Sequence, residues 1–243
     1  MEASHGPSGR NDCSIVGKQI EIATEGGEFD AYLSAPDTDK GPGVIMVSSI
    51  FGVDQGMKDM CDDLSRHGCI ALAQNFFWRD HDSGVLPIPA GIERAVARVG
   101  RIDFDKSVSD LRSGIAEVRR HPNYNGKLAV FGFCFGGPYA WRSACDGFGV
   151  DAAMSFHGTF VSKYMRPGDK PSCPVSFHYG ENDDLAPPEE LDAVKRMADA
   201  TGSEFVIHPG AGHGYMLRGD HYHGEAARKS WERALQMVDA LRT

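Results

Sequence analysis

Short apolar runs recur along the chain and alternate with longer stretches in which apolar residues return every three or four positions. The first pattern is typical of strands buried on both faces of a parallel sheet, and the second of helices that cover such a sheet. Together they predict strands at 43–47, 69–73, 128–131, 150–156, 175–179 and 204–208, and helices at 54–67, 107–120, 138–145, 188–200 and 225–241. We therefore expect an α/β fold with a doubly wound, mostly parallel sheet.

The amino-terminal part of the chain differs from the rest. Residues 14–24 and 27–33 alternate in hydrophobicity around Glu25-Gly26-Gly27, which predicts an opening antiparallel pair joined by a tight turn. Residues 1–12 are polar and contain glycine, so we expect a disordered tail and no signal peptide. No repeat or long linker divides the rest, and residues 13–243 are expected to form one domain.

An irregular segment at 75–89 carries an aromatic cluster followed by an arginine, Phe76-Phe77-Trp78-Arg79. These side chains could line a substrate pocket, or the segment could simply pack on the domain. The sequence does not decide between these two interpretations, nor whether the segment forms a lid.

Composition narrows the possible partners. The formal net charge is -9 and no basic run stands out, which argues against a nucleic-acid surface. No apolar stretch is long enough to span a membrane. Six cysteines are scattered without metal-ligand spacing, which favours free thiols in a reducing cytosol. We expect a cytoplasmic monomer that acts on a small molecule.

The most informative motif is Gly132-Phe133-Cys134-Phe135-Gly136-Gly137, which lies between a predicted strand and a predicted helix. This layout is that of a nucleophile elbow, with cysteine where most elbows carry serine. The flanking glycines leave room for a sharp, strained turn. The following helix places partial positive charge beside the sulfur and favours its thiolate. Cys134 is therefore the predicted nucleophile, although a buried cysteine can also be a small core residue.

A nucleophilic cysteine needs a base, and ten histidines compete for that role. His213 lies in a glycine-rich loop just after the last predicted strand, at the sheet edge where functional groups of parallel sheets gather. His157 follows another strand and could line the pocket. His178 and His208 fall inside strands, where packing roles are expected. His221-Tyr222-His223 lacks a third ligand with suitable spacing and is interpreted as a solvated loop.

The acid that orients the base is expected in Gly180-Glu181-Asn182-Asp183-Asp184, directly after a predicted strand. Any of its three carboxylates satisfies the chain order nucleophile, acid, histidine. Periodicity does not choose among Glu181, Asp183 and Asp184.

With the elbow, Asp183 and His213 in this order, the sequence resembles the dienelactone hydrolase family of α/β-hydrolases. Ile50-Phe51-Gly52-Val53, Asn125-Gly126-Lys127 and Gly212-His213 also match it. The resemblance implies a Cys134–His213–Asp183 triad, with no metal and no organic cofactor. It also implies an oxyanion hole formed by the backbone N–H groups of Ile50 and Phe135.

Two positions depart from the family pattern. The family carries a glutamate that helps to form the thiolate where this chain has Ser49, so Cys134 is expected to rest as an ion pair with His213. The carboxylate-binding arginine after the histidine has no clean counterpart, since Arg218 lies one residue too far along. Further arginines, by default surface residues, are Arg94, Arg98 and Arg101. The candidate substrate-binding residues are Ser49, Phe51, Arg79, His157, Tyr215 and Arg218.

The leading hypothesis is a cysteine hydrolase of small carboxylic esters or lactones. A thioesterase or acyltransferase on the same triad is the first alternative, because such enzymes share the chemistry and differ in the pocket. The second is a non-enzymatic protein of the same fold that binds a ligand or senses oxidants through Cys134.

Overall fold

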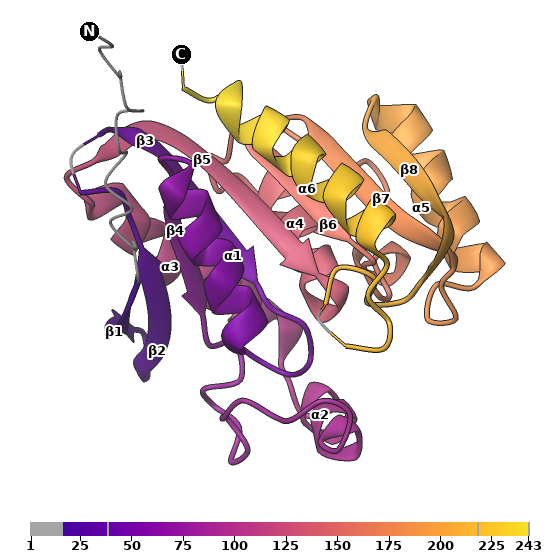
Figure 1. Cartoon of the computed structure of the whole chain (residues 1–243), viewed down its shortest axis with the longest axis horizontal. Coiled ribbons are helices and arrows are strands. Elements are labelled where there is room, and N and C mark those ends of the chain that lie inside the picture. Colours follow the sequence, from indigo (N-terminus) through magenta and orange to yellow (C-terminus); the bar gives the residue numbers. More distant parts are fainter. Residues whose placement is uncertain (1–16, 38, 218, 243) are drawn as a thin grey trace, which may run out of the picture.

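An eight-stranded sheet forms the centre of the molecule in the computed structural model, which describes residues 17–37, 39–217 and 219–242 (Figure 1). The strand order is β1-β2-β4-β3-β5-β6-β7-β8. Strands β1 and β2 run antiparallel, β2 pairs antiparallel with β4, and all other neighbours are parallel. The strands are β1 Lys18–Thr24, β2 Gly27–Ser34, β3 Gly41–Val47, β4 Ile70–Gln74, β5 Tyr124–Phe133, β6 Ala152–Phe156, β7 Val175–Asn182 and β8 Glu204–Gly212.

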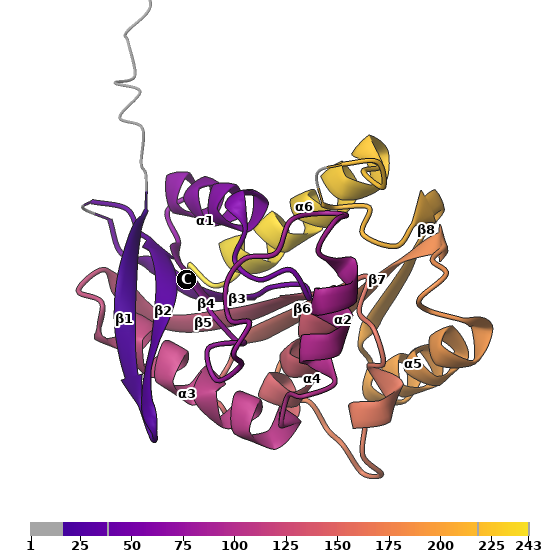
Figure 2. The same cartoon turned by 90° about the horizontal axis from the view of Figure 1, so that it is seen from below.

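Helices cover both faces of this sheet, as Figures 1 and 2 show. Helices α1 and α6 lie on one face, and α3, α4 and α5 on the other. The helices are α1 Gln55–Arg66, α2 Ile92–Val99, α3 Phe104–Arg120, α4 Gly137–Cys145, α5 Pro188–Thr201 and α6 Gly224–Asp239, with 3₁₀ turns η1 Cys134–Gly136 and η2 Ser162–Tyr164. The predicted single α/β domain with a mostly parallel sheet is confirmed. The described residues include no helix long and apolar enough to cross a membrane.

The two faces of the sheet bury separate cores. Met57 and Leu64 of α1 pack with Val238 of α6 on one face. Ile115 of α3 and Val194 of α5 belong to the core of the other. The apolar runs of β3 and β4 are buried along their whole length, because each contributes side chains to both cores. This is the physical reason why these strands read as continuous apolar runs rather than alternating ones.

Most predicted elements are confirmed with small shifts at their ends. The opening hairpin turns at Gly26, whose φ is 92°. The helix predicted from 107 begins three residues earlier, at Phe104, because Asp103 caps it by accepting a hydrogen bond from the Lys106 N–H. The predicted disordered tail at 1–12 lies outside the described residues.

The sequence analysis placed no helix at α2, and this is the main element that it missed. Helix α2 packs through Ala95 against Phe51 and Leu86, in a small cluster apart from the two main cores. The segment before it, at 75–89, packs on the domain: Phe76 and Phe77 are buried and contact Tyr139 and Phe135. These two rings therefore pack on the domain, but they also line a cavity of about 200 Å³ beside Arg79. That this segment contacts a substrate stays a prediction.

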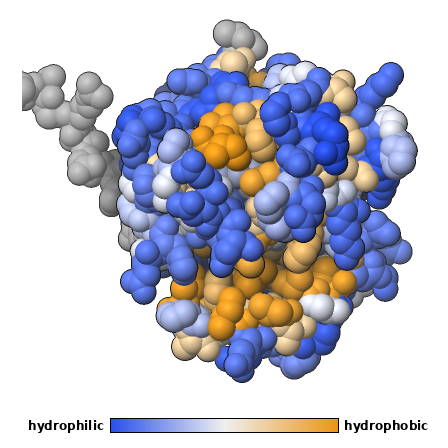
Figure 3. Space-filling model, turned by 90° about the vertical axis from the view of Figure 1, so that its right-hand side faces the viewer, coloured by the Kyte–Doolittle hydropathy of each residue, from blue (hydrophilic) through white to orange (hydrophobic). Residues whose placement is uncertain are grey.

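Apolar side chains are exposed on α2 and in the loops after β6 and β7. Figure 3 shows two hydrophobic areas separated by polar side chains on the face seen there. Exposed apolar residues of the described chain include Ile92 and Val96 on α2, Phe160 after β6 and Leu185 after β7. Phe160 and Leu185 thus follow the same two strands that lead into the candidate site.

Candidate active site

Cys134 lies at the tip of a strained turn between β5 and α4. Its φ is 52°, a conformation that side-chain-bearing residues rarely adopt, and its side chain is buried except for a small area. Among the described residues only His157 and Phe160 share a positive φ without being glycine. Both belong to the loop after β6, whose Thr159 N–H donates to the Cys134 carbonyl at 3.1 Å. Backbone strain is therefore concentrated around the sulfur.

The glycines of the elbow are required by space. A Cβ on Gly132 would lie 2.0 Å from the Gly136 carbonyl oxygen, and one on Gly136 would lie 2.3 Å from the carbonyl oxygen of Val47. Both contacts are with backbone, which cannot move aside as a flexible side chain can. This is the crowding that the sequence motif predicted.

His213 follows β8 directly and is held by Asp183, which follows β7. Nδ1 of His213 lies 2.9 Å from Oδ1 and 3.1 Å from Oδ2 of Asp183. Leu185 N–H donates to the same carboxylate at 3.0 Å and fixes its position. Because Nδ1 is bonded to the acid, Nε2 is the nitrogen left for the sulfur.

The structure separates the three carboxylates that the sequence could not distinguish. Asp183 is buried and bonded to His213, whereas Asp184 is exposed. Glu181 is also exposed and accepts a hydrogen bond from the Gly210 N–H at 2.9 Å. Two of the three therefore lie on the surface, as an acidic loop would suggest.

The pKa of His213 is displaced by its neighbours. Burial lowers this pKa, but the hydrogen bonds to Asp183 and the proximity of the Cys134 side chain, together with the negative charge of both groups, outweigh burial and raise it to about 10. The imidazolium form is thus favoured at neutral pH. A positively charged ring beside the sulfur is what an ion pair with a thiolate requires.

The loop after β3 brings Ile50 and Phe51 to the same edge of the sheet. Arg98, on α2, donates to the Ile50 carbonyl from Nε at 3.0 Å and from Nη2 at 2.6 Å. Its Nη1 donates to the carbonyls of Asp82 and Gly84. The guanidinium also lies 3.8 Å from the centre of the Phe77 ring, which in turn packs on Phe135. Arg98 therefore links the two residues proposed for the oxyanion hole.

The expectation that Arg98 is a surface residue is wrong. Its side chain is fully buried, because three backbone carbonyls of the loops around it need donors that water cannot supply there. The helical spacing of Ile92, Ala95 and Val99 was the pattern that could have revealed this helix.

Ser49 and Phe51 have local tasks in the loop. Ser49 Oγ accepts a hydrogen bond from the Phe51 N–H at 3.3 Å, and Phe51 is buried against α2. These contacts do not supply the negative charge that the family glutamate provides at the position of Ser49. A direct contact of either side chain with substrate stays a prediction.

Of the predicted substrate-binding residues, His157 lies directly beside the triad. Its ring meets that of His213 edge to face, with ring centres 4.9 Å apart, and that of Tyr215 at 5.4 Å. Tyr215 is buried and its hydroxyl lies 2.8 Å from Ser230 Oγ, so its polar end is engaged by α6. Arg218 lies outside the described residues.

The other predicted arginines are already bonded. Arg79 pairs with the buried Asp110 and stacks on Trp78. Arg94 pairs with Asp82, and Arg101 with Asp80. With Arg98 held by carbonyls, all four guanidinium groups have partners within the chain. Substrate binding by Arg79 stays a prediction that would require its ion pair to open.

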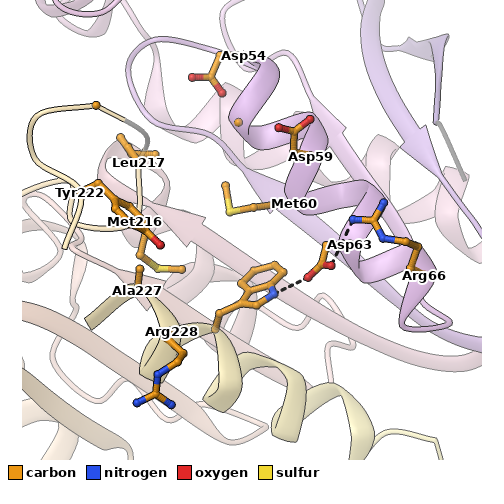
Figure 4. Close-up of a pocket in the computed structure, with 13 residues that line it drawn as sticks. Asp54, Asp59, Met60, Asp63, Arg66, Met216, Leu217, Tyr222, Ala227 and Arg228 are labelled. Atoms are coloured by element: carbon orange, nitrogen blue, oxygen red, sulfur yellow. Dashed lines mark hydrogen bonds and ion pairs between the residues drawn. The ribbon is translucent and has the colours of Figure 1, made fainter. Parts of the chain in front are cut away.

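A cavity of about 690 Å³ lies outside the triad, between α1 and α6. Figure 4 shows Met60 and Met216 facing its interior, with Asp54 at the start of α1 and Asp59 and Asp63 on this helix. Trp231 Nε1 donates to Asp63 at 2.7 Å across it. No triad residue lines this cavity, so we do not assign the substrate to it.

Comparison with known proteins decides the family. The model of the dienelactone hydrolase family matches residues 29–241. The chain belongs to the dienelactone hydrolase family. The predicted resemblance is thereby confirmed, and so is the prediction of a hydrolase.

Individual members of the dienelactone hydrolase family support this assignment. A Yersinia pestis protein named "Putative carboxymethylenebutenolidase" is 31% identical and aligns over 89% of this chain and 85% of its own. A Pseudomonas carboxymethylenebutenolidase is 28% identical over 90% of this chain and 93% of its own. The crystal structure of a "Putative Dienelactone Hydrolase" from Klebsiella pneumoniae superposes with a TM-score of 0.80 at 25% identity, covering 92% of this chain and 98% of that one.

Proposed function

We propose that this protein hydrolyses small carboxylic esters or lactones through an acyl-enzyme on Cys134. The observation that carries the proposal is the Asp183–His213 pair, which leaves Nε2 of His213 to the sulfur of a cysteine at an elbow. The names of its relatives, carboxymethylenebutenolidases, point to the same class of bond.

In the first half-reaction the Cys134 thiolate attacks the carbonyl carbon and forms a C–S bond. The negative charge moves to the carbonyl oxygen, which the N–H groups of Phe135 and Ile50 would stabilise. The C–O bond to the alcohol then breaks, and the His213 imidazolium gives its proton to the leaving alkoxide. A thioester on Cys134 remains.

In the second half-reaction neutral His213 takes a proton from water, and the resulting hydroxide attacks the thioester. The C–S bond breaks, the acid leaves, and the thiolate–imidazolium pair is restored. Asp183 orients His213 throughout and stabilises its charged form. Ser49 takes no part in this cycle, because the resting ion pair needs no further base.

The surroundings of the triad favour an uncharged substrate. Phe160 and Leu185 are exposed apolar residues close in sequence to His157 and Asp183, and the four candidate arginines already have partners within the chain. We further propose that the protein works in a reducing cytosol, since the mechanism needs a free thiol. We also propose that it acts as a monomer and does not bind nucleic acid.

The test is pre-steady-state hydrolysis of p-nitrophenyl acetate. We expect a burst of one nitrophenolate per chain. Cys134→Ala should show no burst, and its kcat should be lower by at least about a thousandfold. Cys145→Ala removes a half-buried thiol away from the triad and is the matched control. Full turnover by Cys134→Ala would refute the proposal. If the burst is observed, a panel of oxygen esters, lactones and thioesters separates an esterase from a thioesterase.

A further inference from the structure

His157 is a buried residue beside the triad that the proposed cycle does not use. Its side chain has no exposed area, and neither ring nitrogen has a hydrogen-bond partner among the residues that the structure describes. Two unpaired nitrogens in a buried ring are costly, since buried polar groups are normally hydrogen-bonded.

The ring nitrogens of His157 and His213 and the sulfur of Cys134 form a compact set of donors. One nitrogen of each ring and the sulfur all lie within 4.8 Å of one another. Thiolate and neutral imidazole are the ligands that Zn²⁺ binds most often, at about 2.3 Å for sulfur and about 2.0–2.1 Å for nitrogen. Around such an ion the ligand atoms would lie roughly 3.3–3.6 Å apart, so closure requires a shift of no more than about 1.5 Å.

The supporting contacts are also those of a metal site. Asp183 holds Nδ1 of His213, which is the carboxylate–histidine arrangement that orients metal-binding histidines. The His157 backbone N–H donates to the His178 carbonyl at 2.7 Å, which fixes the base of the second ligand. The His213 side chain keeps 15% of its surface exposed, so the donor set is not fully closed to solvent.

We propose that Cys134, His157 and His213 form a binding site for Zn²⁺ that reversibly switches off hydrolysis. The ion takes the place of the imidazolium proton on His213, and that proton is released to solvent. Three protein ligands leave a fourth position for water. Binding occupies the nucleophile and the base at once, so the inhibitory part rests on the proposed function, whereas the binding part does not.

Metal binding is measured directly on the reduced full chain. Titration with Co²⁺ should give thiolate-to-cobalt charge-transfer absorption, and calorimetry with Zn²⁺ should give one ion per chain. Cys134→Ala should abolish the absorption band. His157→Phe, which keeps a ring of similar size, should weaken Zn²⁺ affinity at least about tenfold. His157→Asn is a second variant that tolerates the positive φ of 39° and guards against a folding defect.

The control is His221→Ala, which alters the exposed His-Tyr-His loop and should leave affinity unchanged. Loss of binding in His221→Ala with full binding in His157→Phe would overturn the proposal, as would a cobalt band that survives in Cys134→Ala. Zn²⁺ binding without any esterase activity would refute the proposed function alone. Esterase activity unaffected by saturating Zn²⁺ would refute the inhibitory site alone.

Discussion

His213 carries the chemistry at the scale of single residues, because its charge state sets that of the sulfur. Asp183 and Cys134 both stabilise its imidazolium and raise its pKa to about 10 from 6.5. A group whose folded pKa is raised stabilises the fold fully below its unfolded pKa and less as pH rises to the folded one. His213 thus stabilises the folded chain fully below about pH 6.5 and loses this contribution as pH approaches 10.

The pH profile of kcat/KM follows from this pKa. The leaving group needs the imidazolium proton, so activity should fall as pH rises through about 10. Asp183→Asn removes a charge that supports the imidazolium, so the alkaline limb should move to lower pH and kcat should fall. The measurement is kcat/KM against pH for both proteins. An alkaline limb that stays in place in Asp183→Asn would contradict this role of the carboxylate.

The sequence could identify these residues only in part. Chain order and the position of strand ends indicated Cys134 and His213, because the elbow glycines and the last strand are local features. Selecting Asp183 from its acidic neighbours needed the family resemblance, since all three lie on one short loop. His157 lies close to Cys134 and His213 because of the turn after β6. No sequence pattern predicts the strained backbone of this turn.

The oxyanion loop and α2 act as one unit at the scale of elements. The loop after β3 has few backbone partners of its own, and Arg98 supplies donors to Ile50 and to the segment at 82–84. Phe77 then connects this guanidinium to Phe135 at the elbow. The distance between the two proposed oxyanion donors therefore depends on a helix that contributes no reacting group.

Arg98→Met should lower kcat about tenfold to a hundredfold with a smaller change in KM, because displaced donors act mainly on the transition state. It should also lower the free energy of unfolding by about 3 kcal/mol, since buried carbonyls lose their donors. Arg101→Met, which breaks a partly exposed ion pair with Asp80, is the control and should change both quantities little. Kinetics are measured well below the melting temperature. A normal kcat in folded Arg98→Met would refute the positioning role.

Elements with strong periodicity were predictable, whereas those defined by tertiary contacts were not. The runs of β3 and β4 are apolar throughout because both faces are buried, and their prediction held. Helix α2 is short, and the partners of its buried face are Phe51 and Leu86, which lie in loops. Arg98 is buried because it donates to carbonyls in those loops. From the sequence alone it could not be distinguished from an exposed arginine.

The whole molecule gathers its reactive groups at one edge of the sheet. Cys134, His157, Asp183 and His213 all follow the carboxyl ends of β5 to β8, strands that are neighbours in the sheet. Residues up to 79 positions apart in the sequence thus meet because parallel strands end on the same side. The formal net charge of -9 makes the molecule as a whole repel anions.

This charge, together with the engaged arginines, predicts a preference for neutral substrates. p-Nitrophenyl acetate should have at least about a tenfold higher kcat/KM than the mono-p-nitrophenyl ester of succinate, which carries a carboxylate. Added salt should raise the rate for the anionic ester by screening repulsion and leave the neutral ester, the control, unchanged. A preference for the anionic ester that salt abolishes would instead indicate a basic subsite.

The most direct measurement is the identification of the covalent intermediate. The enzyme is mixed with p-nitrophenyl acetate, quenched in acid during the burst, and analysed by peptide mass spectrometry. We predict one acetyl group per chain, attached to the peptide that contains Cys134, and its absence in Cys134→Ala. Continued turnover with no acetylated peptide, or an acetyl group on another residue, would contradict the acyl-enzyme mechanism.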